Sequence, residues 1–336
     1  MIKEARLYTS MEDGRVKCHV CNRECTISEG KYGFCRTRQN KDGKLYTLIY
    51  GVVSSASVDP IEKKPLYHFM PCSMSYSLGT VGCNFRCKHC QNYTISQMRI
   101  DEVNTVEILP EDALDRAVSS GCRSISFTYN EPSIWFEYTY DTAKLAHEAG
   151  LATVYVTNGY ISEKALRTIA PYLDAFSVDI KAFRDKFYKE VCSAKLAPVL
   201  RSAKLARELG MHVEVVNLII PTLNDSLEEI RELVQWVHDN LGDYTPLHFT
   251  RFYPYYKLDK LPPTPLRTLE TAYNIAKEEA MKYVYVGNVP GTEKDNTYCP
   301  NCGKLLIRRH GFDVTYDGLT SDNRCPKCNA EIEIRR

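Results

Sequence analysis

The chain has 336 residues, of which 44% are hydrophobic and 25% charged, an ordinary composition for a globular protein. Lysine and arginine number 43 against 42 aspartates and glutamates, and this net charge of +1 gives no strong electrostatic argument for nucleic acid or a membrane surface as partner. The N-terminal segment lacks the apolar run of a secretory signal, and no stretch is long and apolar enough to cross a bilayer. We therefore expect a cytoplasmic protein built on one large domain.

Fourteen cysteines are too many to explain as disulfides in a reducing compartment. Eleven of them fall into three tight groups of four, three and four, which indicates metal sites. The other three are expected to be buried free thiols: Cys72, Cys122 and Cys192.

The first group lies in an N-terminal extension, residues 1–75. Cys18, Cys21, Cys25 and Cys35 follow a C-x2-C-x3-C-x9-C pattern, and four thiolates indicate a closed site. We favour zinc, and a second [4Fe–4S] cluster that relays electrons to the centre of the protein stays open as the alternative.

Residues 76–290 alternate apolar strands with amphipathic helices, which predicts a parallel sheet with helices outside it. Strands are expected at 76–81, 124–128, 153–157, 175–180, 213–220, 247–252 and 284–287, and helices at 111–121, 133–150, 162–173 and 226–240. We predict an α/β fold, a partial or near-complete (β/α) barrel, with an open doubly wound sheet as the alternative. In a barrel, function belongs at the C-terminal ends of the strands.

The second cysteine group follows the first of these strands. Cys83, Cys87 and Cys90 are spaced C-x-x-x-C-x-x-C, and three thiolates can hold three irons of a [4Fe–4S] cluster. The fourth iron then stays open to an outside ligand. A closed zinc site with His89 as fourth ligand is the structural alternative.

This loop resembles the cluster motif of the radical S-adenosylmethionine (SAM) superfamily. The resemblance implies that SAM chelates the open iron, and that one electron cleaves it to a 5′-deoxyadenosyl radical which abstracts hydrogen from a substrate. It also implies an oxidoreductase-type enzyme, with an electron donor such as a ferredoxin or flavodoxin. His89 stands where the family has an aromatic residue and is expected to pack on the adenine.

Later segments extend the resemblance. Residues 129–132 (YNEP) are similar to the family's G-G-E-P segment, which implies that Glu131 accepts the SAM ammonium, although both glycines are replaced. Residues 156–159 and 178–181 resemble T-N-G and D-L-K segments of the pyruvate formate-lyase activating enzyme. This likeness implies that Thr157 and Asp179 help to hold a monovalent cation and that Lys181 reaches SAM.

Residues 253–256 (YPYY) resemble an L-P-Y-H segment of the same relative, with Tyr256 in place of histidine. Each of these residues also fits a structural role, since a polar residue at a strand end often anchors a loop. The predicted cofactor contacts are His89, Gln91, Asn130, Glu131, Thr157, Asn158, Asp179, Lys181, Asn217, Arg251 and Tyr256.

Six segments resemble one branch, the radical SAM component of the AmmeMemoRadiSam system: YNEP, PTLNDS, RFYP, PPTPLRTLE, YVYVGNVPG and NTYCPNCG. This likeness covers nearly the whole chain. It implies Memo-like and AMMECR1-like proteins as partners.

The third cysteine group lies in residues 291–336. Cys299, Cys302, Cys325 and Cys328 form two C-x-x-C knuckles, which is typical of a zinc ribbon, with iron as the rival metal. A tail this short builds little core, so the metal would supply much of its folding energy.

Three functions remain open. The first is a radical SAM enzyme acting on a small molecule. The second is an activating enzyme that makes a glycyl radical on a partner protein. The third is an iron–sulfur electron-transfer or scaffold protein without SAM chemistry.

Overall fold

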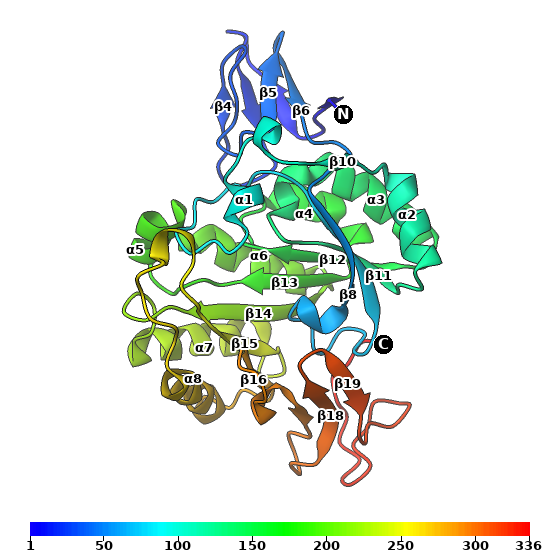
Figure 1. Cartoon of the computed structure of the whole chain (residues 1–336), viewed down its shortest axis with the longest axis vertical. Helices are drawn as coiled ribbons and strands as arrows, with labels where there is room; N and C mark the ends of the chain where they lie inside the picture. The colour runs from blue at the N-terminus through cyan, green and yellow to red at the C-terminus, as the bar shows by residue number, and fades with distance from the viewer.

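The computed structural model describes all 336 residues in three parts along its long axis (Figure 1). A small antiparallel module lies at the top, a large sheet with its helices in the middle, and a second small antiparallel module at the bottom. The two cysteine-rich ends of the chain therefore lie far apart, on opposite sides of the central sheet.

The N-terminal module contains two three-stranded antiparallel sheets, in the orders β1-β6-β5 and β2-β3-β4. Its strands are β1 Lys3–Glu4, β2 Tyr8–Ser10, β3 Val16–Cys18, β4 Thr26–Ile27, β5 Arg38–Lys41 and β6 Lys44–Thr47. A short ladder of β7 Val52–Val53 with β10 Val106–Glu107 follows the module.

The central sheet has eight strands in the order β16-β15-β14-β13-β12-β11-β9-β8. They are β8 Ser55–Pro60, β9 Met74–Gly79, β11 Ser124–Phe127, β12 Ala152–Thr157, β13 Ala175–Asp179, β14 His212–Ile219, β15 Leu247–Arg251 and β16 Val284–Gly287. All run parallel except β8, which pairs antiparallel with β9. Strands β8 and β16 form the two edges of the sheet and do not pair with each other. The sheet therefore stays open and forms a partial barrel, as predicted.

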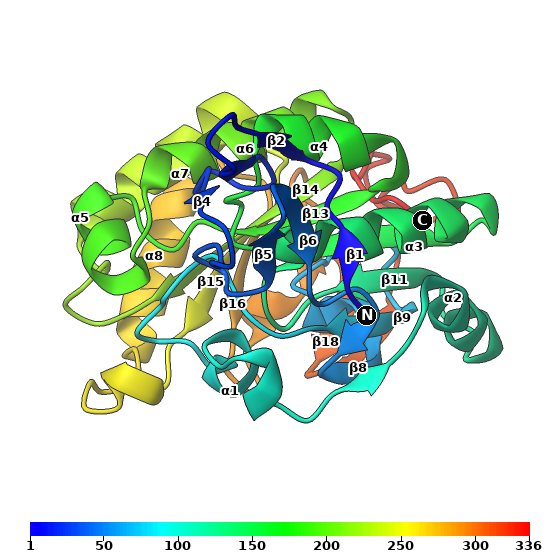
Figure 2. The same cartoon turned by 90° about the horizontal axis from the view of Figure 1, so that it is seen from above.

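Helices cover the outside of this sheet in an arc (Figure 2). They are α2 Pro110–Ser119, α3 Phe136–Glu148, α4 Glu163–Ile169, α6 Leu196–Glu208, α7 Leu227–Leu241 and α8 Leu266–Glu278, with the short α1 Tyr93–Ser96 and α5 Asp185–Phe187. Single turns are η1 Ile61–Lys63, η2 Ile100–Glu102, η3 Pro132–Trp135, η4 Ala170–Tyr172, the π-turn η5 Tyr188–Cys192, η6 Tyr256–Leu258 and η7 Glu293–Asp295. None of the helices combines the length and the apolar character needed to span a bilayer.

Local sequence explains both element types. In α7 the Ser226 hydroxyl accepts a hydrogen bond from the Glu229 N–H at 3.3 Å, and acidic residues fill the first turn, where they complement the helix dipole. One face of α7 is buried: Ile230, Leu233, Val234, Val237 and Leu241. The strands are buried on both faces, as in β11 where all four residues are buried, because helices cover one side and the interior fills the other.

The C-terminal module is a small sheet in the order β17-β18-β19, with β17 Thr297–Tyr298, β18 Leu305–His310 and β19 Asp313–Tyr316. It packs on the edge of the central sheet through buried polar contacts. The guanidinium of Arg309 lies 4.1 Å from the Tyr67 ring centroid, and His68 bonds the Tyr285 hydroxyl at 2.6 Å and the Glu333 carbonyl at 2.7 Å.

Strand β8 belongs to the central sheet although it precedes residue 76 in the chain. The division into units 1–75, 76–290 and 291–336 therefore stays a proposal, with residues 55–75 built into the sheet of the middle unit.

Candidate active site

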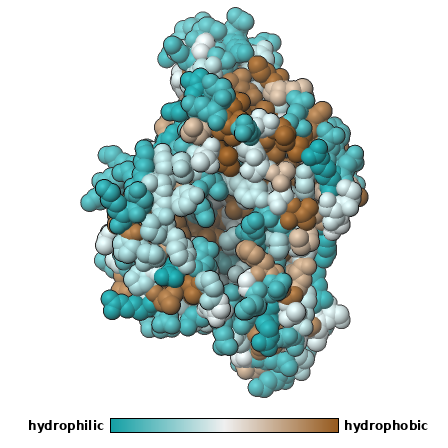
Figure 3. All heavy atoms as spheres, viewed as in Figure 1, coloured by the Kyte–Doolittle hydropathy of each residue, from teal (hydrophilic) through white to brown (hydrophobic).

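A cavity of about 1020 Å³ opens at the C-terminal ends of the parallel strands. In Figure 3 the face toward the viewer is hollowed near its middle, below the N-terminal module. Residues that follow β9, β11, β12 and β13 line one end of the cavity, which is where a barrel of this class concentrates function.

The cysteine loop leaves β9 through Gly82, which has a φ of +90°. A side chain there would meet the Thr37 Cγ2 at 2.6 Å and the Cys35 carbonyl oxygen at 2.9 Å, so only glycine fits. Beyond Gly82 the loop pairs with the end of η5, where the Arg86 N–H donates to Cys192 O and the Lys88 N–H to Val191 O, both at 2.9 Å. These contacts hold the loop against the cavity.

Cys83, Cys87 and Cys90 all line the cavity, as predicted for one shared group. Their sulfurs do not form a set within 4.8 Å of one another, the spacing suited to a single ion. A [4Fe–4S] cluster binds each thiolate at a different iron and spaces the sulfurs more widely, so the donor set fits the cluster. Burial raises the pKa of the Cys83 and Cys90 thiols, so bound metal is what would stabilise the thiolates here.

Cys192 was expected to be an isolated buried thiol. It is buried, but its sulfur lies within 4.8 Å of the Cys87 sulfur and of a His89 ring nitrogen. No spacing rule connects residue 192 to residue 87, so sequence reasoning could not find this contact. Cys122 is buried as expected, whereas Cys72 is exposed because it lies in a turn with φ +64°.

Glu131 follows β11 and is almost fully buried. Its carboxylate accepts hydrogen bonds from the Thr157 hydroxyl and the Asn158 N–H, both at 2.8 Å, and from the Ser133 N–H at 3.0 Å. Burial raises the pKa of this carboxyl group despite those donors. An ionised carboxylate has about four acceptor sites, so one is left for a cationic group in the cavity.

The two predicted asparagines also have structural partners. Asn130 donates to the Gly82 carbonyl at 2.8 Å and accepts from the Thr80 N–H at 3.1 Å. Asn158 donates to the side chain of Asn84 at 2.8 Å. Both line the cavity, and both hold the cysteine loop to the neighbouring strand ends.

Asp179 and Lys181 follow β13 and form an ion pair with Nζ 2.7 Å from Oδ2. Burial disfavours the charged form of Lys181, but Asp179 together with Cys87 and Cys192 outweighs it and raises the pKa of the ammonium well above its usual value. Thr157 bonds Glu131 and Asp179 bonds Lys181, so both predicted cation ligands have protein partners. The monovalent cation stays a prediction.

His89 and Gln91 lie at the same end of the cavity. His89 is buried, its Nδ1 has no hydrogen-bond partner, and burial lowers the pKa of the ring to about 3. A neutral imidazole is suited to packing on an adenine. Gln91 is exposed at the rim.

Three of the predicted cofactor contacts do not line the cavity, and their role in cofactor binding stays a prediction: Asn217, Arg251 and Tyr256. Side chains alternate along β14 and β15, so Val216, Leu218 and Thr250 face the interior, whereas Asn217 bonds the Ile180 carbonyl and Arg251 the Thr264 carbonyl. Tyr256 stacks on Tyr93 at 4.5 Å, beyond the cavity.

The sequence analysis does not predict the far end of the cavity, because its residues come from three distant segments of the chain. It is lined by Glu62, Lys64 and Tyr67 before β9, by His248 on β15, and by Asp295 and Phe312 near the C-terminal module. No local pattern marks these residues, since they meet only through the packing of the two terminal extensions.

Two carboxyl groups at this end carry unpaired buried oxygens, Glu62 Oε2 and Asp295 Oδ1. Burial raises the pKa of Glu62, and it raises the pKa of Asp295 to about 6. A buried acceptor without a partner is costly, so this end is suited to a ligand that brings hydrogen-bond donors.

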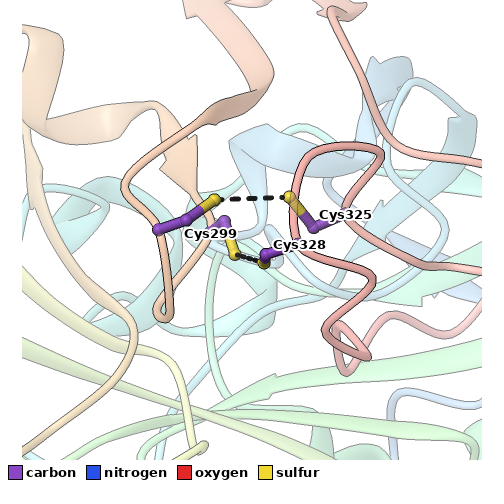
Figure 4. A group of neighbouring side chains, drawn as sticks. Cys299, Cys325 and Cys328 are labelled. Carbon is purple, nitrogen blue, oxygen red and sulfur yellow. Dashed lines mark hydrogen bonds between the residues drawn. The ribbon is translucent and has the colours of Figure 1, made fainter.

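The C-terminal cysteines converge on one point (Figure 4). Cys299 and Cys328 sulfurs lie 3.5 Å apart, Cys302 and Cys325 sulfurs 3.6 Å, and all four lie within 4.8 Å of one another. Four thiolates on one tetrahedral ion with bonds of about 2.3 Å would lie about 3.8 Å apart, so the set fits a single ion. The N-terminal cysteines line one common pocket but form no such set.

Comparison with known proteins agrees with the expected family. The model of the Radical SAM superfamily matches residues 77–237. The chain is 49% identical to "Uncharacterized protein MJ0808" of Methanocaldococcus jannaschii over 99% of both chains. It is 30% identical to the pyruvate formate-lyase-activating enzyme of Clostridium pasteurianum, over 45% of this chain and 64% of that one.

Among solved structures, a radical SAM methyltransferase from Sphaerobacter thermophilus superposes with a TM-score of 0.51 at 14% identity, over 90% of this chain and 81% of that chain. At that identity the likeness concerns the fold alone.

Proposed function

The chain belongs to the radical SAM superfamily, whose members cleave SAM at an iron–sulfur cluster, and we propose that it uses this chemistry to abstract hydrogen from a small polar molecule. The observation that supports a small-molecule substrate is the single cavity that runs from the cysteine loop to Glu62 and Asp295. Its volume of about 1020 Å³ lies at the upper end of the roughly 300–1,000 Å³ typical of small-molecule sites, which leaves room beside SAM.

Cys83, Cys87 and Cys90 would hold the cluster. When bound, a reduced [4Fe–4S] cluster supplies one electron for SAM cleavage and an open iron as the SAM anchor. The main-chain Phe85 N–H, 3.3 Å from the Cys83 sulfur, and the Ser96 hydroxyl, 3.1 Å from the Cys90 sulfur, would tune the thiolates.

The other residues at this end would orient SAM. Glu131, fixed by three donors, would accept the SAM ammonium with its remaining lone pair. Lys181 would face the SAM carboxylate, with Asp179 keeping it charged. His89 would contact the adenine with an unprotonated ring.

The substrate would occupy the far end, between residues 62–67, His248 and the C-terminal module. Glu62 and Asp295 offer unpaired acceptors, which favours a substrate with hydroxyl or ammonium donors. Phe312 and the neighbouring Gly311, at the turn between β18 and β19, would help to exclude water from the reacting carbon.

A second candidate is an activating enzyme that makes a glycyl radical on a partner protein. The 30% identity to the activating enzyme of Clostridium pasteurianum favours it. It would require a protein segment to reach the cavity between the two modules. An iron–sulfur electron-transfer or scaffold role, the third function, would not explain why a large cavity lies beside the cysteine loop.

Radical SAM enzymes need a reductant, and a ferredoxin or flavodoxin is proposed for this one. Memo-like and AMMECR1-like partners stay a proposal from sequence likeness. Zinc is proposed for the C-terminal cysteines, whose sulfurs have the spacing of a single tetrahedral ion.

The substrate class can be tested with the anaerobically reconstituted, reduced protein and SAM. Cell extract is separated into a small-molecule filtrate and a protein fraction, and 5′-deoxyadenosine is measured with each. Stimulation by the filtrate, with deuterium from labelled metabolites entering 5′-deoxyadenosine, supports the proposal. Stimulation by the protein fraction alone, with a glycyl-radical signal in the electron paramagnetic resonance spectrum, would establish the activating function instead.

A pair of variants locates the substrate. Asp295→Asn and Glu62→Gln keep the shape of the far end while changing its acceptors. We expect them to lower the filtrate-stimulated rate about tenfold, through loss of one hydrogen bond each, while SAM binding stays unchanged. Unchanged stimulation in both would place the substrate elsewhere. Arg308→Ala, an exposed change in the C-terminal module, serves as control.

A further inference from the structure

The two outer cysteine groups differ in the spacing of their sulfurs. The C-terminal sulfurs form a set within 4.8 Å, whereas neither the N-terminal four nor Cys83, Cys87 and Cys90 do. The last three lie in the loop that holds the cluster in this superfamily, so they provide an internal reference for cubane spacing. The N-terminal site, like that reference, lacks the close spacing of a single-ion site, whereas the C-terminal site has it.

We propose that Cys18, Cys21, Cys25 and Cys35 hold a second [4Fe–4S] cluster, with a cysteine ligand for every iron. This assignment replaces the sequence-based preference for zinc. A single zinc ion would draw four sulfurs to about 3.8 Å from one another, whereas a cubane places each sulfur on a separate iron. The four cysteines line a common pocket, so they surround one site.

The lining of this pocket suits a large anionic cluster. Apolar Val20, Ile27 and Ile134 form much of it, and Gly33 leaves a gap, because a Cβ there would lie 3.8 Å from both the Cys25 and the Cys35 sulfurs. The Phe34 N–H donates to Cys25 at 3.4 Å.

The guanidinium of Arg38 also lines the pocket. It is 2% exposed, it pairs with Glu137 at 2.6 Å, and its Nε–H has no partner. A buried unpaired donor beside four thiolates is satisfied when sulfur of a bound cluster accepts its hydrogen bond. The Arg38 charge would also offset part of the cluster's negative charge.

The N-terminal site lies directly against the loop of the central cluster. The Cys35 carbonyl oxygen is 2.9 Å from the position that a Cβ on Gly82 would take, and Gly82 precedes Cys83. Arg86 donates to the Cys83 carbonyl at 2.8 Å and also to the Phe34 carbonyl, and Arg23 donates to the Asn84 carbonyl at 2.9 Å. Two hydrogen bonds, from Arg86 to Phe34 and from Arg23 to Asn84, and the close approach of Cys35 to Gly82 therefore join the two cysteine segments.

This proximity assigns the second cluster a role as an electron relay. A low-potential one-electron donor of the ferredoxin or flavodoxin class would reduce the N-terminal cluster, which then passes the electron to the central cluster without bond changes. Cys21 and Cys25 are partly exposed, so a donor can approach from that side. The relay rests on the proposed function, whereas the metal assignment does not.

The metal assignment is tested with iron and zinc analysis of the reconstituted full-length chain. In the triple variant Cys83→Ala/Cys87→Ala/Cys90→Ala, only the N-terminal site can hold a cluster. We expect about four irons per chain and, after reduction, the electron paramagnetic resonance signal of a [4Fe–4S]⁺ cluster. Adding Cys25→Ala to this triple variant should remove both the iron and the signal.

Two further measurements guard against misfolding. The wild-type chain should contain about eight irons, and Cys302→Ala/Cys328→Ala should lose zinc and keep its iron. A triple variant without iron, together with a wild type holding about four irons, overturns the inference. If that wild type also contains two zinc ions, the N-terminal site is a zinc site while the proposed function stands. The relay is overturned if Cys25→Ala leaves flavodoxin-driven SAM cleavage at the wild-type rate.

Discussion

The N-terminal and C-terminal modules are both small antiparallel structures that carry four cysteines, yet they are attached to the central sheet in different ways. The N-terminal site is bonded to the cluster loop through Arg86 and packs against Gly82. The C-terminal site lies at the opposite end of the molecule, and its module meets the barrel through Arg309 and His68 instead. Cysteine count alone thus says little about role, whereas sulfur spacing and the neighbouring elements distinguish the two sites.

The largest expected effect concerns the C-terminal metal. Structural zinc in a four-cysteine site contributes about 10–16 kcal/mol of apparent binding energy, which for so small a module is folding energy. Cys302→Ala/Cys328→Ala should therefore make residues 297–336 sensitive to limited proteolysis, while the barrel keeps its circular dichroism spectrum. A protease-resistant tail in this variant would mean that the module folds without metal.

The N-terminal module contacts helix α3 through the buried ion pair of Arg38 and Glu137. Arg38→Met leaves the Glu137 carboxylate buried without its partner and should destabilise the fold by about 3–5 kcal/mol in urea unfolding. Adding Glu137→Leu should recover most of that loss. No recovery in the double variant would show that the pair itself, and not the stranded charge, provides the stability.

The contact between the N-terminal module and the cluster loop is tested at Gly82. Gly82→Ala adds a methyl group 2.6 Å from Thr37 and should destabilise the chain by about 1–3 kcal/mol, with lower iron loading at the central site. Gly14→Ala is the matched control, because Gly14 also has a positive φ but nothing within 4 Å of a Cβ. If both variants lose the same amount of stability, the strained backbone conformation explains the effect and the contact with Thr37 does not.

The smallest expected effect is a pH dependence of stability that belongs to the C-terminal module and not to the N-terminal one. Burial lowers the pKa of His68 from its ordinary 6.5 to about 3, so the unfolded chain takes up a proton between those values that the folded chain does not. Stability is therefore complete above pH 6.5 and is lost as the pH falls, by roughly 1.4 kcal/mol per unit.

His68→Gln should flatten this part of the stability curve, measured as Tm against pH from 7 to 5. The acid sensitivity should appear first as proteolysis of the C-terminal module, because His68 bonds Glu333 and Tyr285. Equal slopes for His68→Gln and the wild type would mean that another group controls the acid response.

Much of the fold was predictable, because largely apolar strand segments alternate along the chain with amphipathic helical segments. The cysteine loop, Glu131 and Lys181 were predictable because each follows such a strand and lines the cavity. Asn217 and Arg251 were not, since moving one residue along a strand moves a side chain to the other face, and strand ends cannot be fixed that finely from sequence.

The substrate end of the cavity lay beyond prediction for another reason. Tyr67, His248 and Phe312 are far apart in the chain and meet only when both extensions pack on the barrel. The N-terminal metal likewise depends on the spacing of sulfurs in space, which the C-x2-C-x3-C-x9-C pattern does not contain.

The most direct test of the central claim is SAM cleavage by the reduced, reconstituted protein, comparing the wild type, Cys87→Ala and Cys122→Ala. Cys122 is a buried thiol that follows the end of α2 in the chain, and it serves as the matched control. We predict 5′-deoxyadenosine and methionine from the wild type and Cys122→Ala, and none above background from Cys87→Ala. Equal product from Cys87→Ala would contradict the assignment of the cluster to Cys83, Cys87 and Cys90.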